Sequence, residues 1–121
     1  MPEKRVIEKL KTRPQYLKVA KENVRKAMPG VVVQYLPPAG KDGPVRVGLT
    51  VTARTGGAVD RNRIKRRLRA VIGEILPLCG QPGATYVVIG RRATLTRSYE
   101  KLAEDLKTAV EALNKRAKNK E

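Results

Sequence analysis

The stretch that decides the fold is residues 45–69, which read VRVGLTVTARTGGAVDRNRIKRRLR. Its first nine residues alternate strictly, with an apolar side chain at every odd position from Val45 to Ala53. Such a period of two predicts a half-buried β-strand. Beyond a pair of glycines the period changes, and Ile64 opens a series of apolar residues at helical spacing that ends near Pro77. We therefore expect a strand, a turn and an amphipathic helix in direct succession.

The flanking segments extend this pattern in both directions. Residues 14–27 predict a helix that begins at a proline and ends before a Pro-Gly pair. The runs at 31–36 and 85–89 are rich in β-branched residues and predict strands. The segment from about Ser98 keeps helical spacing again. The predicted order is α-β-β-α-β-α, with an extra strand, written α-β-β-(β)-α-β-α, if the segments before the basic helix divide further.

One sheet with helices packed on it would cover all of these apolar faces. We therefore predict the α+β class, with a single sheet of about four strands packed with helices. A length of 121 residues favours a single domain over residues 1–121. Within it we expect an ordered core over about 8–114, with flexible segments at 1–7 and 115–121.

The composition excludes several classes of site. The chain has no His and one Cys, Cys79, so it cannot form a His-based catalytic triad, a Cys–His pair or an intramolecular disulfide. A Cys/His zinc site is excluded for the same reason. No apolar run approaches the roughly 18 residues that span a bilayer. The charged segment Met1–Thr12 lacks the apolar stretch of a signal peptide. We therefore expect a cytoplasmic protein with no membrane partner.

The positive charge is concentrated on one predicted helix. The chain carries 27 Lys and Arg against 11 Asp and Glu, a formal charge of +16. Six of the cations lie within residues 61–69, which contain no acid. Five of the six are Arg, whose planar fork of donors matches phosphate oxygens. A solvated helix face is the ordinary alternative, but such crowding of like charge is favourable only beside an anion. The run therefore predicts a nucleic-acid partner, and composition alone leaves RNA and DNA open.

The same stretch resembles the protein subunit of bacterial ribonuclease P. The family's signature is a strand with Arg-apolar-Gly, a Ser-Lys-Lys-like turn and Gly-x-Ala-Val-x-Arg-Asn-Arg-x-Lys-Arg-x-x-Arg. Residues 46–69 match this pattern without a gap. The segment from Tyr86 to Arg92 is similar to the family's last strand, and Tyr99 is similar to the aromatic that opens its last helix. The resemblance covers about residues 8–114.

The resemblance implies a function and a fold feature. Family members bind a large catalytic RNA, and the holoenzyme is an endoribonuclease that removes the 5′ leader of precursor tRNA. The RNA positions Mg²⁺ and carries the chemistry, so the protein alone should be inactive, with no catalytic or metal-ligating residue of its own. The implied partners are the catalytic RNA and precursor tRNA, with no protein partner. The family's β-α-β crossover around the basic helix is left-handed, whereas the general rule would predict a right-handed one.

The resemblance also implies two sets of site residues. The set that contacts the catalytic RNA is Arg54, Arg61, Asn62, Arg63, Lys65, Arg66, Arg67 and Arg69. The set that lines a cleft for the single-stranded leader is Tyr16, Lys18, Ala20, Val32, Gln34 and Arg91. An unpaired leader base could stack on the ring of Tyr16.

The chain departs from the family pattern at three places. The Ser-Lys-Lys turn reads Thr52-Ala53-Arg54, which keeps one cation. Ala20 and Gln34 replace aromatic residues of the leader cleft. We therefore expect weaker discrimination of the leader, with more reliance on Lys18 and Arg91. A structural RNA-binding protein such as a ribosomal protein is the alternative function, and a DNA-binding helix module is the third.

Overall fold

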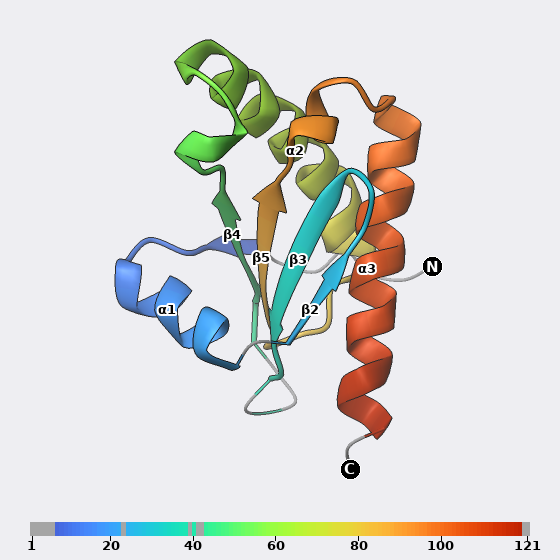
Figure 1. The fold of residues 1–121 in the computed structure, drawn as a ribbon. Coiled ribbons are helices and arrows are strands. Elements are labelled where there is room, and N and C mark those ends of the chain that lie inside the picture. Colours follow the sequence, from blue (N-terminus) through green and yellow to red (C-terminus); the bar gives the residue numbers. More distant parts are fainter. Residues whose placement is uncertain (1–6, 23, 39, 41–42, 120–121) are drawn as a thin grey trace.

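The structure is a computed structural model that describes residues 7–22, 24–38, 40 and 43–119 (Figure 1). It contains five strands, three α-helices and two short 3₁₀ helices, η1 and η2, within these residues. In chain order the elements are β1 Ile7–Lys9, α1 Arg13–Glu22, β2 Val24–Ala27, β3 Val31–Leu36, β4 Val45–Thr50, η1 Ala53–Thr55, α2 Ala58–Cys79, β5 Thr85–Gly90, η2 Arg92–Leu95 and α3 Tyr99–Asn119.

The strands form one mixed sheet in the order β1-β4-β5-β3-β2. β4 is parallel to β1 and to β5, whereas β3 is antiparallel to β5 and to β2. The predicted α+β class is confirmed, with five strands where about four were expected. In Figure 1, β4 and β5 point upward, β5 lies to the right of β4, and α2 passes behind them. The β4-α2-β5 crossover is therefore left-handed, as the resemblance implied.

The predicted helix over 14–27 is wrong in its second half. α1 ends at Glu22, and Val24–Ala27 forms β2, which pairs with β3 in an antiparallel hairpin. The Met28 N–H donates to the carbonyl of Val31 at 2.8 Å and closes the turn. Pairing with the buried strand β3 therefore overrides the helix that the flanking prolines had suggested for these residues. β1 was missed because three residues are too short to show a period.

Several element ends also differ from the prediction. The strand predicted over 45–53 ends at Thr50, because the chain turns into η1. α2 passes Pro77, its predicted end, and reaches Cys79. A proline in the last turn of a helix removes a single hydrogen bond, so the helix can continue briefly. α3 runs to Asn119, past the predicted end at 114, and residues 1–6 lie outside the described part of the chain.

The two faces of the sheet are packed differently. One face, called the covered face here, lies under α2 and α3 and carries the buried side chains of Val31, Val33 and Tyr35. The opposite face, the open face, is covered only in part, by Val19 of α1 and by Leu10, which lies between β1 and α1. No helix in the described residues is long and apolar enough to cross a membrane.

Candidate nucleic-acid interface

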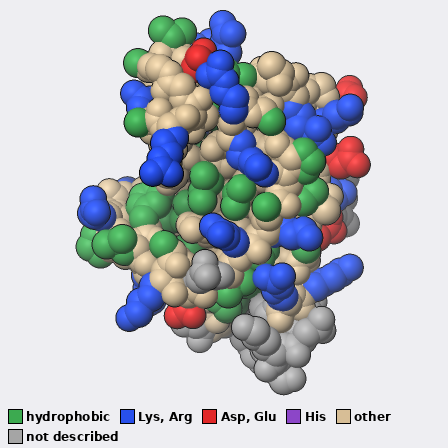
Figure 2. Space-filling view, in the orientation of Figure 1, with side chains coloured by type: hydrophobic (Ala, Val, Ile, Leu, Met, Phe, Trp, Pro, Cys, Tyr) green, Lys and Arg blue, Asp and Glu red, His purple; other side chains and the backbone are tan. Residues whose placement is uncertain are grey.

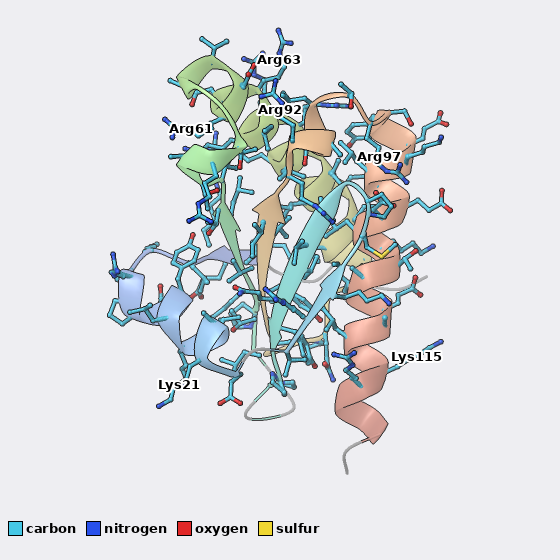
Figure 3. All side chains as sticks on the ribbon, viewed as in Figure 1. Lys21, Arg61, Arg63, Arg92, Arg97 and Lys115 are labelled. Carbon is cyan, nitrogen blue, oxygen red and sulfur yellow. The ribbon has the colours of Figure 1, made fainter. Side chains whose placement is uncertain are left out.

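The amino-terminal half of α2 presents the predicted basic run to solvent. Ile64 and Leu68 are fully buried against the covered face, which fixes the rotation of the helix about its axis. The opposite side of the helix is therefore exposed, and it carries Asn62, Arg63, Arg66 and Arg69. Arg54, in η1 just before α2, is exposed as well. Figure 3 shows Arg61 and Arg63 projecting from the same end of the molecule.

The open face forms the floor of the second predicted site. Val32 and Gln34 of β3 lie opposite Ile89 and Val87 of β5, and their side chains point to this face. The side chains of these floor residues remain partly open to solvent, since Val32, Gln34 and Ile89 are half-buried. Figure 2 shows apolar side chains at the centre of this face with Lys and Arg around them. A floor of this kind can accept a flat apolar group whose attached charge reaches the surrounding cations.

Tyr16 forms one wall of this site, and its position explains why residue 48 is a glycine. A Cβ at Gly48 would lie 2.5 Å from Cε1 of Tyr16, a distance that real Cβ atoms do not show. Glycine at this position therefore lets the ring of Tyr16 lie directly against β4. The hydroxyl of Tyr16 accepts a hydrogen bond from the N–H of Leu49 at 3.4 Å. The ring is held in place but remains half-buried, with part of its surface open.

The structure brings together most of the predicted cleft residues but separates one of them. Ala20 is exposed and lies about 40° around α1 from Tyr16, on the same flank of the helix. Lys18 lies about 160° around the helix from Ala20, on the other flank. Arg91 is exposed at the opposite rim, and its Nη1 donates to the carbonyl of Met28 at 2.9 Å.

Comparisons with known proteins agree on one family. A sequence model of the family described as Ribonuclease P matches residues 5–114. The chain belongs to the ribonuclease P protein family. The ribonuclease P protein component of Paramagnetospirillum magneticum is 40% identical over 107 residues, covering 86% of this chain and 80% of the relative. That of Caulobacter vibrioides is 42% identical over 106 residues, covering 88% of this chain and 70% of the relative. The chain is therefore a component of a ribonuclease that acts in tRNA processing, which implies an RNA partner.

Solved structures show that the fold is the same. The ribonuclease P protein of Staphylococcus aureus superposes with a TM-score of 0.69 at 21% identity, covering 86% of this chain and 93% of the other. The protein from Thermotoga maritima superposes with a TM-score of 0.67 at 24% identity, covering 82% of this chain and 91% of the other. At this level of identity the agreement concerns the fold alone.

Arg67 has a different environment from the other cations of the run in this ribonuclease P protein. Its side chain is partly buried and crosses to η2, where Nη1 donates to the carbonyls of Thr94 and Leu95, the latter at 2.9 Å. Nη2 donates to the carbonyl of Arg97. The guanidinium therefore fastens α2 to η2. The sequence could not reveal this, because the acceptors are backbone atoms about thirty residues away.

Arg92 joins the cationic end of the ribonuclease P protein, although it was not among the predicted site residues. Its Nη1 donates to Oδ2 of Asp60 at 3.0 Å and to the carbonyl of Thr55 at 3.2 Å. This pairing offsets the charge of Asp60, the acid that opens α2. The adjacent basic pair at 91 and 92 was the sequence signal, and Figure 3 shows Arg92 at the same end of the molecule as Arg63.

A polar cluster fixes the turn between β2 and β3 beside the predicted leader site. The buried carboxylate of Asp105 accepts from the N–H of Gly30 at 3.0 Å and pairs with Arg97. Thr94 donates through Oγ1 to the carbonyl of Gly30 at 2.7 Å. A Cβ at Gly30 would lie 2.8 Å or less from Leu102 and Asp105, so only glycine fits. The rim of the open face is thereby tied to η2 and α3.

The described residues hold no cluster of three or more His, Cys, Asp or Glu side chains that could bind a metal ion. Three of the described carboxylates pair with arginines instead: Glu8 with Arg46, Asp60 with Arg92 and Asp105 with Arg97. A hydrogen bond from Tyr99 to the carboxylate of Glu74 raises the pKa of the Tyr99 phenol. The donor set of this part of the ribonuclease P protein does not suit a divalent cation bound by the protein alone.

Proposed function

We propose that this ribonuclease P protein binds the catalytic RNA of ribonuclease P through the cationic end of α2 and holds the 5′ leader of precursor tRNA on the open face. The observation that carries the proposal is the presence of two surfaces of different chemistry on one rigid fold. One is an array of arginines with no unpaired acid beside it in the part of the chain that the structure describes, and the other is a half-open apolar floor with an aromatic wall.

The arginine array suits a folded RNA. Arg61, Arg63, Arg66 and Arg69 present forked donors on a helix whose other side is locked into the core. Each guanidinium that meets a phosphate displaces a condensed counterion, so the affinity should fall steeply as salt is added. Arg54 and Lys65 add charge at the two sides of the array. Arg67 does not project with the other arginines, because its guanidinium fastens α2 to η2.

The open face suits an extended single strand. One unpaired base can stack on the half-open ring of Tyr16, and the next can lie on Val32 and Ile89. Gln34, at the centre of the floor, offers both a donor and an acceptor to a base edge. Arg91, at the rim, can meet a leader phosphate.

The chemical step is assigned to the RNA partner in this proposal. The chain has no His and a single Cys, and the described carboxylates form no ligand cluster. We therefore place Mg²⁺ on the catalytic RNA, where phosphate oxygens supply its preferred ligands. The contribution of the protein is to bind and orient both RNAs, so that the leader lies in register with the RNA active site.

The test is reconstitution of the holoenzyme. Precursor tRNA is incubated with the cognate catalytic RNA at low Mg²⁺, with and without the protein, and the appearance of the mature 5′ end is measured. Cleavage should rise when the protein is added, and the protein alone should give none. A photo-crosslinker at Gln34 should attach to the leader. Unchanged cleavage together with no leader crosslink would overturn the proposal in favour of a purely structural RNA-binding protein.

A further inference from the structure

We propose that this ribonuclease P protein carries a second nucleotide site, a pocket between α2 and the free edge of β4 that accepts one unpaired nucleotide protruding from a folded RNA. The inference rests on the proposed binding of RNA. The pocket shares Tyr16 with the leader cleft, and its other lining residues lie outside that cleft. The cavity measures about 620 Å³, within the range of pockets that hold small molecules. It is called the edge pocket below.

The edge pocket exists because β1 is shorter than β4. The pairing between these strands ends at Val47, so the outer edge of β4 is open beyond that residue. The N–H of Leu49 at this edge donates to the hydroxyl of Tyr16 instead of to a neighbouring strand. Such an edge attracts strands of other chains unless something covers it. Here α2 and Tyr16 stand on its two sides and leave a slot between them.

One side of α2 forms the long wall of the slot. Lys65, Arg69, Gly73 and Pro77 follow one another at intervals of four residues, which places them along one edge of the helix. The first two supply positive charge, and the last two leave the wall low and flat. The floor between this wall and β4 is apolar, since it is formed by Leu49 and Ile72 among others.

The charges around the edge pocket are all of one sign. Among the described residues, the lining of the cavity includes three cations, Lys9 of β1 with Lys65 and Arg69 of α2, and no acid. An apolar slot beneath three cations matches the two halves of a nucleotide, a flat base and an anionic phosphate. The free energy needed to unstack a nucleotide is smallest when that nucleotide is already unpaired. A bulge or an irregular loop of the RNA is therefore the expected source.

Gly73 is the residue that the fold alone does not explain. A Cβ at this position would meet no atom within 4 Å, so packing does not require glycine. The residue lies inside α2, where glycine is less stable than alanine. Its lack of a side chain does, however, keep the wall of the edge pocket flat. The position therefore offers a substitution that fills the pocket without disturbing the core.

The experiment compares two hairpin RNAs that differ by one bulged 2-aminopurine. The wild-type protein should bind the bulged hairpin about tenfold more tightly than the fully paired one, which is the scale of one stacked base. Stacking in the slot should also change the fluorescence of the 2-aminopurine. Gly73→Leu should reduce the affinity ratio to about one, since the new side chain fills the slot. Ala70→Leu, at an exposed position of the same helix outside the pocket, should leave the ratio unchanged.

A second pair of variants holds the charge constant. Arg69→Gln and Arg66→Gln both remove one cation from the run, but only Arg69 lines the edge pocket. Both should weaken binding to either hairpin, whereas only Arg69→Gln should lower the ratio. Equal ratios for the two variants, or no preference of the wild type for the bulge, would overturn the inference. Stimulation of precursor tRNA cleavage by the wild type is measured in parallel, and its absence would count against the proposed function instead.

Discussion

The two faces of the sheet use the same strands for different purposes. On β3, Val31, Val33 and Tyr35 are at most 1% exposed on the covered face, whereas the alternate residues Val32 and Gln34 remain half-open on the other. The covered face anchors α2, and this anchoring turns the arginines of the helix outward. The open face contributes contact surface directly. The comparison teaches that one surface is expected to act through charge carried by a helix, and the other through apolar area and shape.

The charged surface should show the largest effect. Replacing Arg61 and Arg63 together with alanine removes two predicted phosphate contacts, each worth about 1.5 kcal/mol for a charge-assisted hydrogen bond, so affinity for the catalytic RNA should fall roughly a hundredfold. The slope of log affinity against log salt should become less steep by about 1.8. Filter binding across a salt series measures both. Unchanged affinity would show that these side chains are merely solvated, and an unchanged melting temperature would show that the fold is intact.

Within the basic run, the next effect separates stability from binding. Arg67→Met keeps the apolar stem but leaves the carbonyls of Thr94, Leu95 and Arg97 without their donor. The free energy of unfolding should fall by about 2 kcal/mol, measured by urea denaturation. Arg66→Met is the matched control, because Arg66 is exposed, and it should change stability by no more than about 0.5 kcal/mol. Equal losses in the two variants would contradict the structural role of Arg67.

On the open face, a gain of function is the sharper test. Ala20→Phe adds a ring on the flank of α1 that carries Tyr16, and it should strengthen binding of precursor tRNA about tenfold relative to mature tRNA, which lacks the leader. Lys21→Phe is the control, because Figure 3 shows Lys21 pointing away from the sheet. Its lost charge affects both RNAs alike, so the ratio should stay constant. An unchanged ratio for Ala20→Phe would place the leader elsewhere.

Periodicity predicted the elements that the two surfaces share. It failed where contacts between residues distant in the sequence determine the local structure. The spacing of Ile64 and Leu68 correctly gave the exposed side of α2, because a buried helix face is a local property of the sequence. β2 was missed because its strand conformation depends on pairing with β3 rather than on its own residues. The role of Arg67 and the edge pocket depend on segments that meet only in the folded chain.

The smallest expected effect concerns the covered face alone. Burial raises the pKa of the Tyr35 phenol above its ordinary value of 10.0, so the folded state favours the neutral form. The stabilisation that this provides is fully present below pH 10 and is lost as the pH rises through the raised pKa. Tyr35→Phe keeps the ring beside Tyr86 but removes the hydroxyl that donates to Gln81, so it should cost about 1 kcal/mol at pH 7. Urea denaturation at increasing pH should show the wild type losing stability faster than the variant above pH 10. Parallel losses would mean that Tyr35 ionises as freely as in the unfolded chain, and the covered face would then be less tightly closed than its packing implies.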